Sequence, residues 1–370
     1  MKVLYDHQIF ENQDYGGISR YFTELIQNNP SAQISLKYSD NIYLKNEYFT
    51  AYNILPKDFE YDKFFNNFNF KGKRRLFNLF SSITGKNNKN ISIKQLKKSY
   101  DIFHPTYYDT YFLRYLIDIP FVLAVYDMIH ELFPNHYNKD KNIINNKKIL
   151  INKSKCIIAI SENTKKDIIK LFPDINEDKI HVVFLGSSFP ILNIDNKKDN
   201  YILYTGGRWS YKNFENFIRA AAPLLLKYGI KLICTGSLFN ENEIRLLNEL
   251  NIINNVTHIF ADEKELVNLY KKAIAFIFPS FYEGFGIPVL EAFSSGCPAL
   301  LSNTSSLPEV GGNAALYFDP NSINDIRKKI DDVICSPALQ KELTEKGIER
   351  AKLFSWEKCV KETIDVYNNI

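Results

Sequence analysis

The amino-acid sequence predicts an α/β protein in which two doubly wound domains face a central cleft. The chain has 370 residues, of which 45% are hydrophobic, and this is more than one compact core usually supports. In the C-terminal half, short β-branched apolar runs alternate with helical patterns, and a less regular version of this rhythm runs through the N-terminal half. Such alternation is typical of parallel sheets whose two faces are covered by helices.

The expected strands follow from the apolar runs. In the N-terminal half we expect them at 2–6, 34–38, 100–103, 121–126, 155–160 and 181–185, and in the C-terminal half at 201–205, 231–235, 256–260, 274–278 and 298–302. Between the first two C-terminal runs, apolar residues recur at the i, i+3, i+4, i+7 spacing of a helix. The pattern dissolves between residues 40 and 100, and Gly, Ser and Pro replace it near 186–200. We therefore expect an N-terminal domain at 1–187, with an insertion at about 60–100, and a C-terminal domain at 188–355. A final helix at 356–370 is expected to join the N-terminal domain.

The charge of the chain is small overall but segregated. The formal net charge is +4, which argues against a dedicated nucleic-acid binder. Between Asp62 and Asp101 there are ten basic residues and no acidic one, so the remainder of the chain carries a net charge of −6. Five widely spaced cysteines form no CxxC pair, which disfavours both a disulfide scaffold and a zinc cluster. The sequence shows no signal peptide and no membrane-spanning run, so a cytoplasmic location is expected.

The segment from Phe278 to Pro298 is the most informative in the chain. A strand is expected to end near Pro279, a glycine-containing loop to follow, and a helix to begin near Pro288. Glu283 then lies in the loop and Glu291 about one turn into the helix. A carboxylate in each place can grip two hydroxyl-bearing parts of one ligand, while loop amides and the helix N-terminus hold an anion between them. The alternative is that Glu291 only complements the helix dipole.

A second polar segment follows the first C-terminal strand, with Gly206 and Gly207 ending the strand and Arg208 and Lys212 next to the following helix. An arginine binds a diphosphate with two parallel hydrogen bonds, and a lysine adds a point charge. The alternative is an ordinary solvated loop.

These segments resemble the family 4 retaining glycosyltransferases, which have the GT-B fold of two Rossmann-like domains. Glu283 and Glu291 fall on the two glutamates of that family's Glu-x7-Glu motif, and the stretch 303–320 is similar throughout. The resemblance covers nearly the whole chain and weakens over 40–100. It implies transfer of a hexosyl unit from a nucleotide-diphosphate sugar to a saccharide or lipid-linked acceptor, in surface polysaccharide or glycan assembly. The blocks at 204–213 and 126–134 lean toward mannosyltransferase-like members.

The resemblance also implies roles for single residues. Glu283 lies near the donor sugar, Glu291 binds the nucleotide ribose, and Arg208 and Lys212 neutralise the leaving diphosphate. The other residues expected to bind the donor are Gly16, Gly17, Gly207, Gly284, Phe285 and Gly286. The leaving phosphate helps to deprotonate the acceptor, so no enzymic nucleophile is needed.

The acceptor side is less clearly marked. Many relatives carry a histidine immediately before Asp127, whereas this chain has Tyr126, so Asp127 and His130 are the polar catalytic candidates. We also place Arg20, His104 and Tyr126 at the acceptor side of the cleft. Each histidine has an alternative structural role.

No metal and no cofactor are expected, so transfer should be metal-independent. The group His130, Glu131 and His136 does not have the spacing of a helical metal motif, and no Asp-x-Asp feature ends a strand.

The basic segment at 63–98 interleaves phenylalanines with its positive charges, a composition that suits an anionic membrane surface. The alternatives are a solvated insertion or an RNA-binding one. For the whole chain, two other functions are kept open: a nucleotide-sugar epimerase of the same fold, and a non-catalytic subunit that binds a sugar nucleotide or a membrane. A dehydrogenase is disfavoured because no GxGxxG follows an expected strand.

Overall fold

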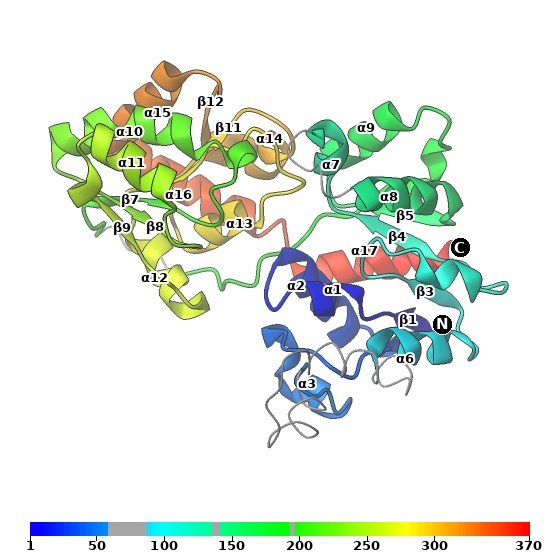
Figure 1. Ribbon diagram of the computed structural model, residues 1–370. Helices are drawn as coiled ribbons and strands as arrows, with labels where there is room; N and C mark the ends of the chain where they lie inside the picture. The colour runs from blue at the N-terminus through cyan, green and yellow to red at the C-terminus, as the bar shows by residue number, and fades with distance from the viewer. Residues whose placement is uncertain (58–86, 135–140, 193–196) are drawn as a thin grey trace.

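The computed structural model describes residues 1–57, 87–134, 141–192 and 197–370, and it folds into two α/β domains (Figure 1). The predicted fold class, two doubly wound domains, is confirmed. The predicted insertion at about 60–100 falls largely on 58–86, outside the described residues. Among the described residues, no helix is both long and apolar enough to cross a membrane.

The N-terminal domain contains two parallel three-stranded sheets, ordered β2-β1-β3 and β4-β5-β6. A parallel bridge between Phe103 and Phe121 joins them along one edge, so the strands follow one another as in a single sheet. The strands are β1 (Val3–Tyr5), β2 (Ala32–Ile34), β3 (Ile102–His104), β4 (Val122–Val125), β5 (Cys156–Ala159) and β6 (Ile180–Val182). The described helices are α1 (Gln8–Asn12), α2 (Gly17–Gln27), α3 (Glu47–Thr50), α6 (Asn88–Leu96), α7 (Ile129–Leu132), α8 (Lys141–Lys153) and α9 (Glu162–Leu171).

The C-terminal domain has one parallel six-stranded sheet in the order β12-β11-β10-β7-β8-β9. Its strands are β7 (Tyr201–Tyr204), β8 (Lys231–Cys234), β9 (Val256–His258), β10 (Ala275–Phe278), β11 (Ala299–Ser302) and β12 (Ala315–Phe318). Its helices are α10 (Phe214–Tyr228), α11 (Glu241–Glu249), α12 (Glu263–Lys272), α13 (Ile287–Ser294), α14 (Leu307–Gly311), α15 (Ile323–Cys335) and α16 (Pro337–Ala351). The chain order reverses between β10 and β7, and ligands of such sheets bind at a reversal of this kind, outside the carboxyl ends of the strands.

Alternate residues of β7 show why its sequence is continuously apolar. Ile202 and Tyr204 belong to the core formed with α10 and α15, whereas Tyr201 and Leu203 belong to the core on the opposite face. Both faces are therefore buried. The strand predictions missed β12. The strand predicted at 34–38 is wrong in its range, since β2 spans Ala32–Ile34. The edge strand β12 pairs with β11 and is mostly half-buried, so its sequence carries a weaker strand pattern.

The last helix, α17 (Trp356–Asn368), crosses back and packs on the N-terminal domain (Figure 1). Its Tyr367 hydroxyl bonds to the Tyr5 hydroxyl at 2.9 Å. The chain passes between the two domains twice, near Gly186 and near Trp356. These two segments touch each other: a Cβ atom on Gly186 would lie 2.3 Å from the Trp356 nitrogen. Only a glycine at position 186 allows the two backbones to come this close, so the domains are joined at one compact double connection.

Candidate active site

The β10–α13 loop holds Glu283 at the carboxyl edge of the C-terminal sheet, as the sequence predicts. Two serines of the loop after β11 fix it in place. The Glu283 N–H donates to Ser305 Oγ at 2.9 Å, and the Ser306 hydroxyl donates to the Glu283 and Phe285 carbonyls, both at 2.9 Å. The helix that follows begins at Ile287, one residue before Pro288. Neither serine was predicted to support the site.

Lys212 meets Glu283 across the switch point of the sheet. Its Nζ lies 2.7 Å from Glu283 Oε1, and the two side chains are 16% and 12% exposed. The turn that carries Lys212 depends on Asn213, which has a φ of 56° and donates from its buried amide to the Pro279 and Pro320 carbonyls. An asparagine tolerates this left-handed conformation better than most residues, which explains why an asparagine directly follows Lys212.

Arg208 does not join Lys212. Its Nε lies 2.9 Å from Glu243 Oε1 at the start of α11, and its Nη2 donates to the Leu238 carbonyl at 2.8 Å. The guanidinium also stacks on Phe239, with Cζ 4.5 Å from the ring centroid. The structure gives the two residues different partners, Glu243 for Arg208 and Glu283 for Lys212, and their joint role on one diphosphate stays a prediction.

Glu291 lies on α13 with a hydroxyl network beneath it. The Tyr270 hydroxyl donates to Glu291 Oε2 at 3.3 Å and also shares a 3.0 Å hydrogen bond with the Thr205 hydroxyl. Burial raises the pKa of the Glu291 carboxyl to about 7, and the Tyr270 hydrogen bond opposes this rise. Tyr270 and Thr205 were not predicted, because a tyrosine in an apolar helical pattern gives no sign of a polar role.

The first glycine loop places α2 against α13. A Cβ atom on Gly17 would lie 3.2 Å from the Ile287 side chain, so the first residues of the two helices lie close to each other. Helix N-termini favour a bound anion, so this region suits a phosphate. Gly16 lies just before α2, and Gly207 and Gly286 lie in the β7–α10 and β10–α13 connections.

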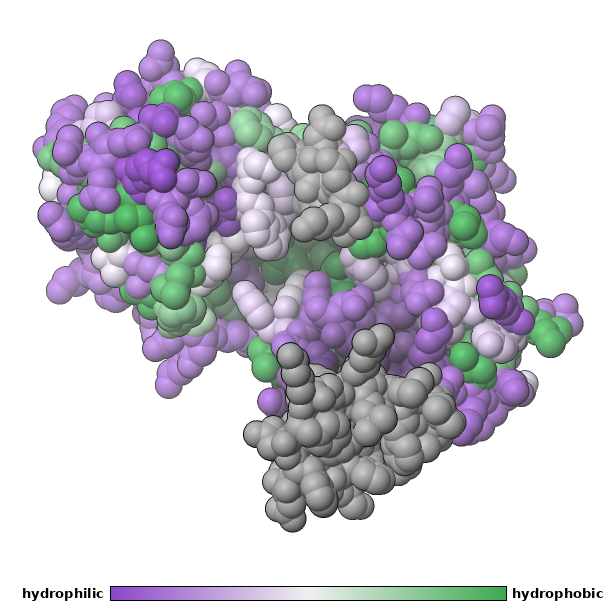
Figure 2. Space-filling view, in the orientation of Figure 1, coloured by the Kyte–Doolittle hydropathy of each residue, from purple (hydrophilic) through white to green (hydrophobic). Residues whose placement is uncertain are grey.

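Arg20 reaches across the cleft from α2. Its Nη1 lies 2.8 Å from Glu263 Oε1 on α12, and its Nε bonds to Glu24 at 3.0 Å. The guanidinium also lies over the Tyr43 ring, 4.8 Å from the centroid. Figure 2 shows a hollow between the two domains.

Opposite Glu283, the β4–α7 loop carries Asp127 and His130. Asp127 Oδ1 accepts the Ile129 N–H at 3.0 Å, and His130 is half-buried on the short helix α7. A fully buried lysine supports the loop from below: Lys147 donates to the Asp127 carbonyl at 3.1 Å and pairs with Glu131 at 3.0 Å. Sequence reasoning missed Lys147, since it lies in a polar, lysine-rich helical stretch.

The structure corrects the placement of His104 and Tyr126 at the acceptor side. His104 is fully buried beneath α17 and bonds through Nδ1 to the Tyr367 hydroxyl at 2.6 Å. Burial lowers its pKa to about 3, so it stays neutral at ordinary pH. Tyr126 is 5% exposed and packs against Tyr21 and Phe22 in the core.

Gly284 lies at a contact between the two domains. A Cβ atom on it would lie 1.8 Å from the Tyr126 carbonyl oxygen, so no other residue fits this approach. Next to it, the Tyr282 hydroxyl accepts the Met128 N–H at 3.1 Å and donates to Asp167 at 2.7 Å. The donor-loop backbone is thus in direct contact with the N-terminal domain.

Glu309 makes a further contact between the domains. Its carboxylate accepts the Glu162 and Asn163 backbone N–H groups, at 2.9 and 3.0 Å, and so caps α9 from the opposite domain. We call the Glu309, Tyr282 and Gly284 contacts the interdomain latch. Within the described ranges, which exclude His136, no group of three His, Cys, Asp or Glu residues is placed to hold a metal ion.

Comparisons with known proteins agree with this arrangement. Residues 188–350 match the family described as Glycosyl transferases group 1. The chain is 30% identical to O-antigen chain mannosyltransferase B of Escherichia coli over 63% of this chain and 66% of that protein. It is 28% identical to O-antigen chain mannosyltransferase RfbU of Salmonella typhimurium, over 50% of this chain and 53% of that protein. The chain thus spans about half to two thirds of the length of these two relatives.

Solved structures share the fold over the full chain. The Anabaena protein HepE in complex with UDP-glucose superposes with a TM-score of 0.73 at 13% identity, with all of both chains covered. A glycosyltransferase from Rickettsia africae gives a TM-score of 0.66 at 18% identity, covering all of this chain and 98% of that one. The GT-B arrangement expected from the sequence is confirmed.

Proposed function

We propose that this chain is a retaining glycosyltransferase, because residues 188–350 match the group 1 glycosyltransferase family. It moves a hexosyl unit, with mannosyl favoured, from a nucleotide-diphosphate sugar to a saccharide or lipid-linked acceptor in surface polysaccharide or glycan assembly. The two O-antigen mannosyltransferases among its relatives support the choice of sugar.

The Lys212–Glu283 pair is the observation that carries this proposal. The 2.7 Å ion pair holds both side chains at the switch point of the sheet. A diphosphate that enters between the helix N-termini of α2 and α13 competes with Glu283 for the Lys212 ammonium. Lys212 then neutralises the leaving group, and the released Glu283 carboxylate can accept hydrogen bonds from hydroxyls of the donor sugar.

Donor specificity for a nucleotide rests on Glu291. Its carboxyl stands above the Tyr270 hydroxyl, and a carboxylate with one supporting donor has free lone pairs for two ribose hydroxyls. In the transfer step, the bond from the anomeric carbon to the diphosphate breaks while a bond to the acceptor oxygen forms on the same face. The acceptor proton passes to the departing phosphate oxygen, and no enzymic nucleophile takes part. The Lys212 charge, rather than a metal ion, neutralises the departing diphosphate in this proposal.

The N-terminal domain is the acceptor side in this proposal, with Asp127 and His130 facing the donor loop. The basic segment 63–98 binds an anionic membrane surface when the acceptor is lipid-linked. Co-sedimentation with phosphatidylglycerol vesicles tests this part. Binding should weaken when Lys71, Lys73, Arg74 and Arg75 are changed to glutamine, and equal binding by the variant contradicts it.

Product analysis tests the function. The protein is incubated with GDP-mannose, UDP-glucose or UDP-N-acetylglucosamine, with and without an α-mannoside acceptor, and the products are followed by NMR. A glycosyltransferase gives a new α-glycoside and nucleoside diphosphate only when acceptor is present. Conversion of the donor sugar without acceptor indicates the epimerase, and donor binding without turnover indicates a non-catalytic subunit.

A further inference from the structure

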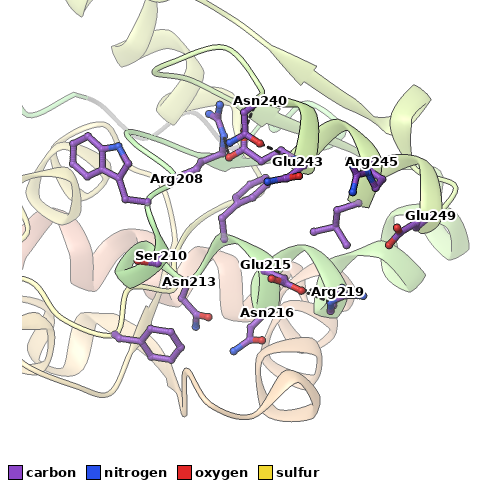
Figure 3. Close-up of a pocket in the computed structure, with 15 residues that line it drawn as sticks. Arg208, Ser210, Asn213, Glu215, Asn216, Arg219, Asn240, Glu243, Arg245 and Glu249 are labelled. Atoms are coloured by element: carbon purple, nitrogen blue, oxygen red, sulfur yellow. Dashed lines mark hydrogen bonds and ion pairs between the residues drawn. The ribbon is translucent and has the colours of Figure 1, made fainter. Parts of the chain in front are cut away.

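A cavity of about 700 Å³ lies between α10 and α11 on the C-terminal domain (Figure 3). We call it the α10–α11 groove. It is lined by Arg208, Trp209, Ser210, Asn213, Phe214, Glu215, Asn216, Arg219, Asn240, Asn242, Glu243, Arg245, Leu246, Glu249 and Phe281. Lys212, Glu283 and Glu291 do not line it, so the groove lies beside the donor site and shares with it the loop that carries Arg208 and Lys212.

The charges of the α10–α11 groove balance. Three arginines and three glutamates line it, and two ion pairs are already formed within it: Arg208 with Glu243 at 2.9 Å and Arg219 with Glu215 at 2.8 Å. A groove with no net charge has little attraction for a phosphate, a nucleic acid or an acidic glycan. Balanced charge therefore favours a neutral ligand over an anionic one.

Several polar side chains of the groove are uncommitted. Those of Asn242, Arg245 and Glu249 make no hydrogen bond or ion pair with the other residues that the structure describes. Arg208 is 2% exposed, and its buried Nη1 also finds no acceptor within the described chain. Planar amide, guanidinium and carboxylate groups arranged in this way can hydrogen-bond the paired hydroxyls of a sugar.

An apolar surface accompanies these polar groups. Trp209 lines the groove and is 64% exposed, and Phe281 lines it from the β10–α13 loop. A flat, accessible ring suits the apolar C–H face of a pyranose. A volume of about 700 Å³ falls within the range of small-molecule sites and accommodates several sugar rings.

We propose that the α10–α11 groove is a second saccharide site, which binds a neutral oligosaccharide independently of the nucleotide-sugar. That the groove holds an already assembled part of the glycan rests on the proposed function. That the groove binds an oligosaccharide does not. The groove would keep the growing chain on the enzyme between successive transfers.

Saturation-transfer NMR with α-mannotriose and maltotriose tests the site without any turnover. At least one of the two trisaccharides should bind wild-type protein with a Kd in the millimolar range, both in the absence and in the presence of saturating GDP and UDP. The variants Trp209→Ala and Arg245→Ala should each weaken binding at least tenfold. Lys212→Ala and Leu353→Ala, the latter an exposed apolar residue away from the groove, should bind as wild type does.

Three results overturn the second site: no binding of either trisaccharide at 50 mM, competition by the nucleotides, or binding that survives in both groove variants. The test of the donor site is separate. Lys212→Ala should lose nucleotide binding and keep trisaccharide binding, so failure of the proposed donor site and failure of the second saccharide site give different results. Trp209→Ala should also retain transfer to a monosaccharide acceptor, and a loss of more than tenfold there would place Trp209 in the donor site instead.

Discussion

Two lysine–glutamate pairs, one in each domain, differ in burial. Lys147 and Glu131, below the β4–α7 loop, are 0% and 8% exposed, whereas Lys212 and Glu283, at the donor loop, are 16% and 12% exposed. Lys147 also donates to the Asp127 carbonyl, and its ammonium lies over the Tyr108 ring, so this pair is held inside the domain. In the second pair, Glu283 belongs to the loop that leads into α13 and both side chains keep some exposure. The comparison indicates that the Lys147–Glu131 pair fixes the β4–α7 loop, whereas Lys212 can exchange Glu283 for a ligand.

Removing one member of the buried pair should have the largest effect on stability. Lys147→Met leaves the Glu131 carboxylate buried without its partner, a change that typically costs about 3–5 kcal/mol. Chemical denaturation should show the loss, and the double variant Lys147→Met/Glu131→Leu should recover most of it. Near-wild-type stability of the single variant contradicts a structural role for the pair.

Removing the lysine of the exchangeable pair should instead act on turnover. Lys212→Ala takes away the charge that stabilises the leaving diphosphate, and the loss of one such group typically costs about 10²–10³-fold in rate. Its melting temperature should stay close to that of wild type, because Glu283 can be solvated from the cleft. Lys227→Ala, on the exposed last turn of α10, is the matched control. Unimpaired turnover in Lys212→Ala removes the basis of the mechanism.

A variant of the interdomain latch should change how closely the two domains approach without changing the residues at the donor loop. Glu309→Ala removes two charge-assisted hydrogen bonds across the domains, worth together about 2–4 kcal/mol at most, so the closed form should become less populated. Small-angle scattering should record a larger radius of gyration, and turnover should fall about tenfold. Glu345→Ala, an exposed glutamate on α16, provides the control. An unchanged radius and rate would mean that Glu309 only caps α9.

The smallest expected effect is a pH dependence from Glu291. Its carboxyl has a pKa raised to about 7 by burial, so the folded protein keeps this proton where the unfolded chain, with an ordinary value near 4.5, has lost it. The free energy of unfolding should therefore fall as pH rises from about 4.5 to 7, and Glu291→Gln should remove that part of the fall.

Nucleotide-sugar affinity should change in the opposite sense, because the ionised carboxylate is the better acceptor for ribose hydroxyls. Binding should tighten by up to about tenfold between pH 6 and 8 in wild type and stay flat in Glu291→Gln. Calorimetry with an intact nucleotide-sugar, whose phosphates do not titrate in this range, provides the measurement. Equal pH profiles for the two proteins would exclude Glu291 from ribose binding.

The sequence was sufficient for features that depend on local pattern. Strands such as β7 and β10 are apolar throughout because they are buried on both faces, and the carboxyl ends of parallel strands necessarily bring Lys212 and Glu283 to one edge. Contacts made by distant segments could not be predicted. The direction of Arg208 depends on Glu243, 35 residues later, and the burial of His104 depends on α17 at the end of the chain. Glu309 caps a helix of the other domain, and no periodicity within one segment indicates that.

Thermal stabilisation by nucleotide-sugars tests the central claim most directly, because it asks whether the Lys212–Glu283 region is a donor site. Wild-type protein, Lys212→Ala and Lys227→Ala are melted with saturating GDP-, UDP-, ADP- and dTDP-sugars. The account predicts that one nucleotide class raises the melting temperature of wild type and of Lys227→Ala by several degrees, and that of Lys212→Ala much less. No shift with any of the four classes, or an equal shift in all three proteins, would contradict it.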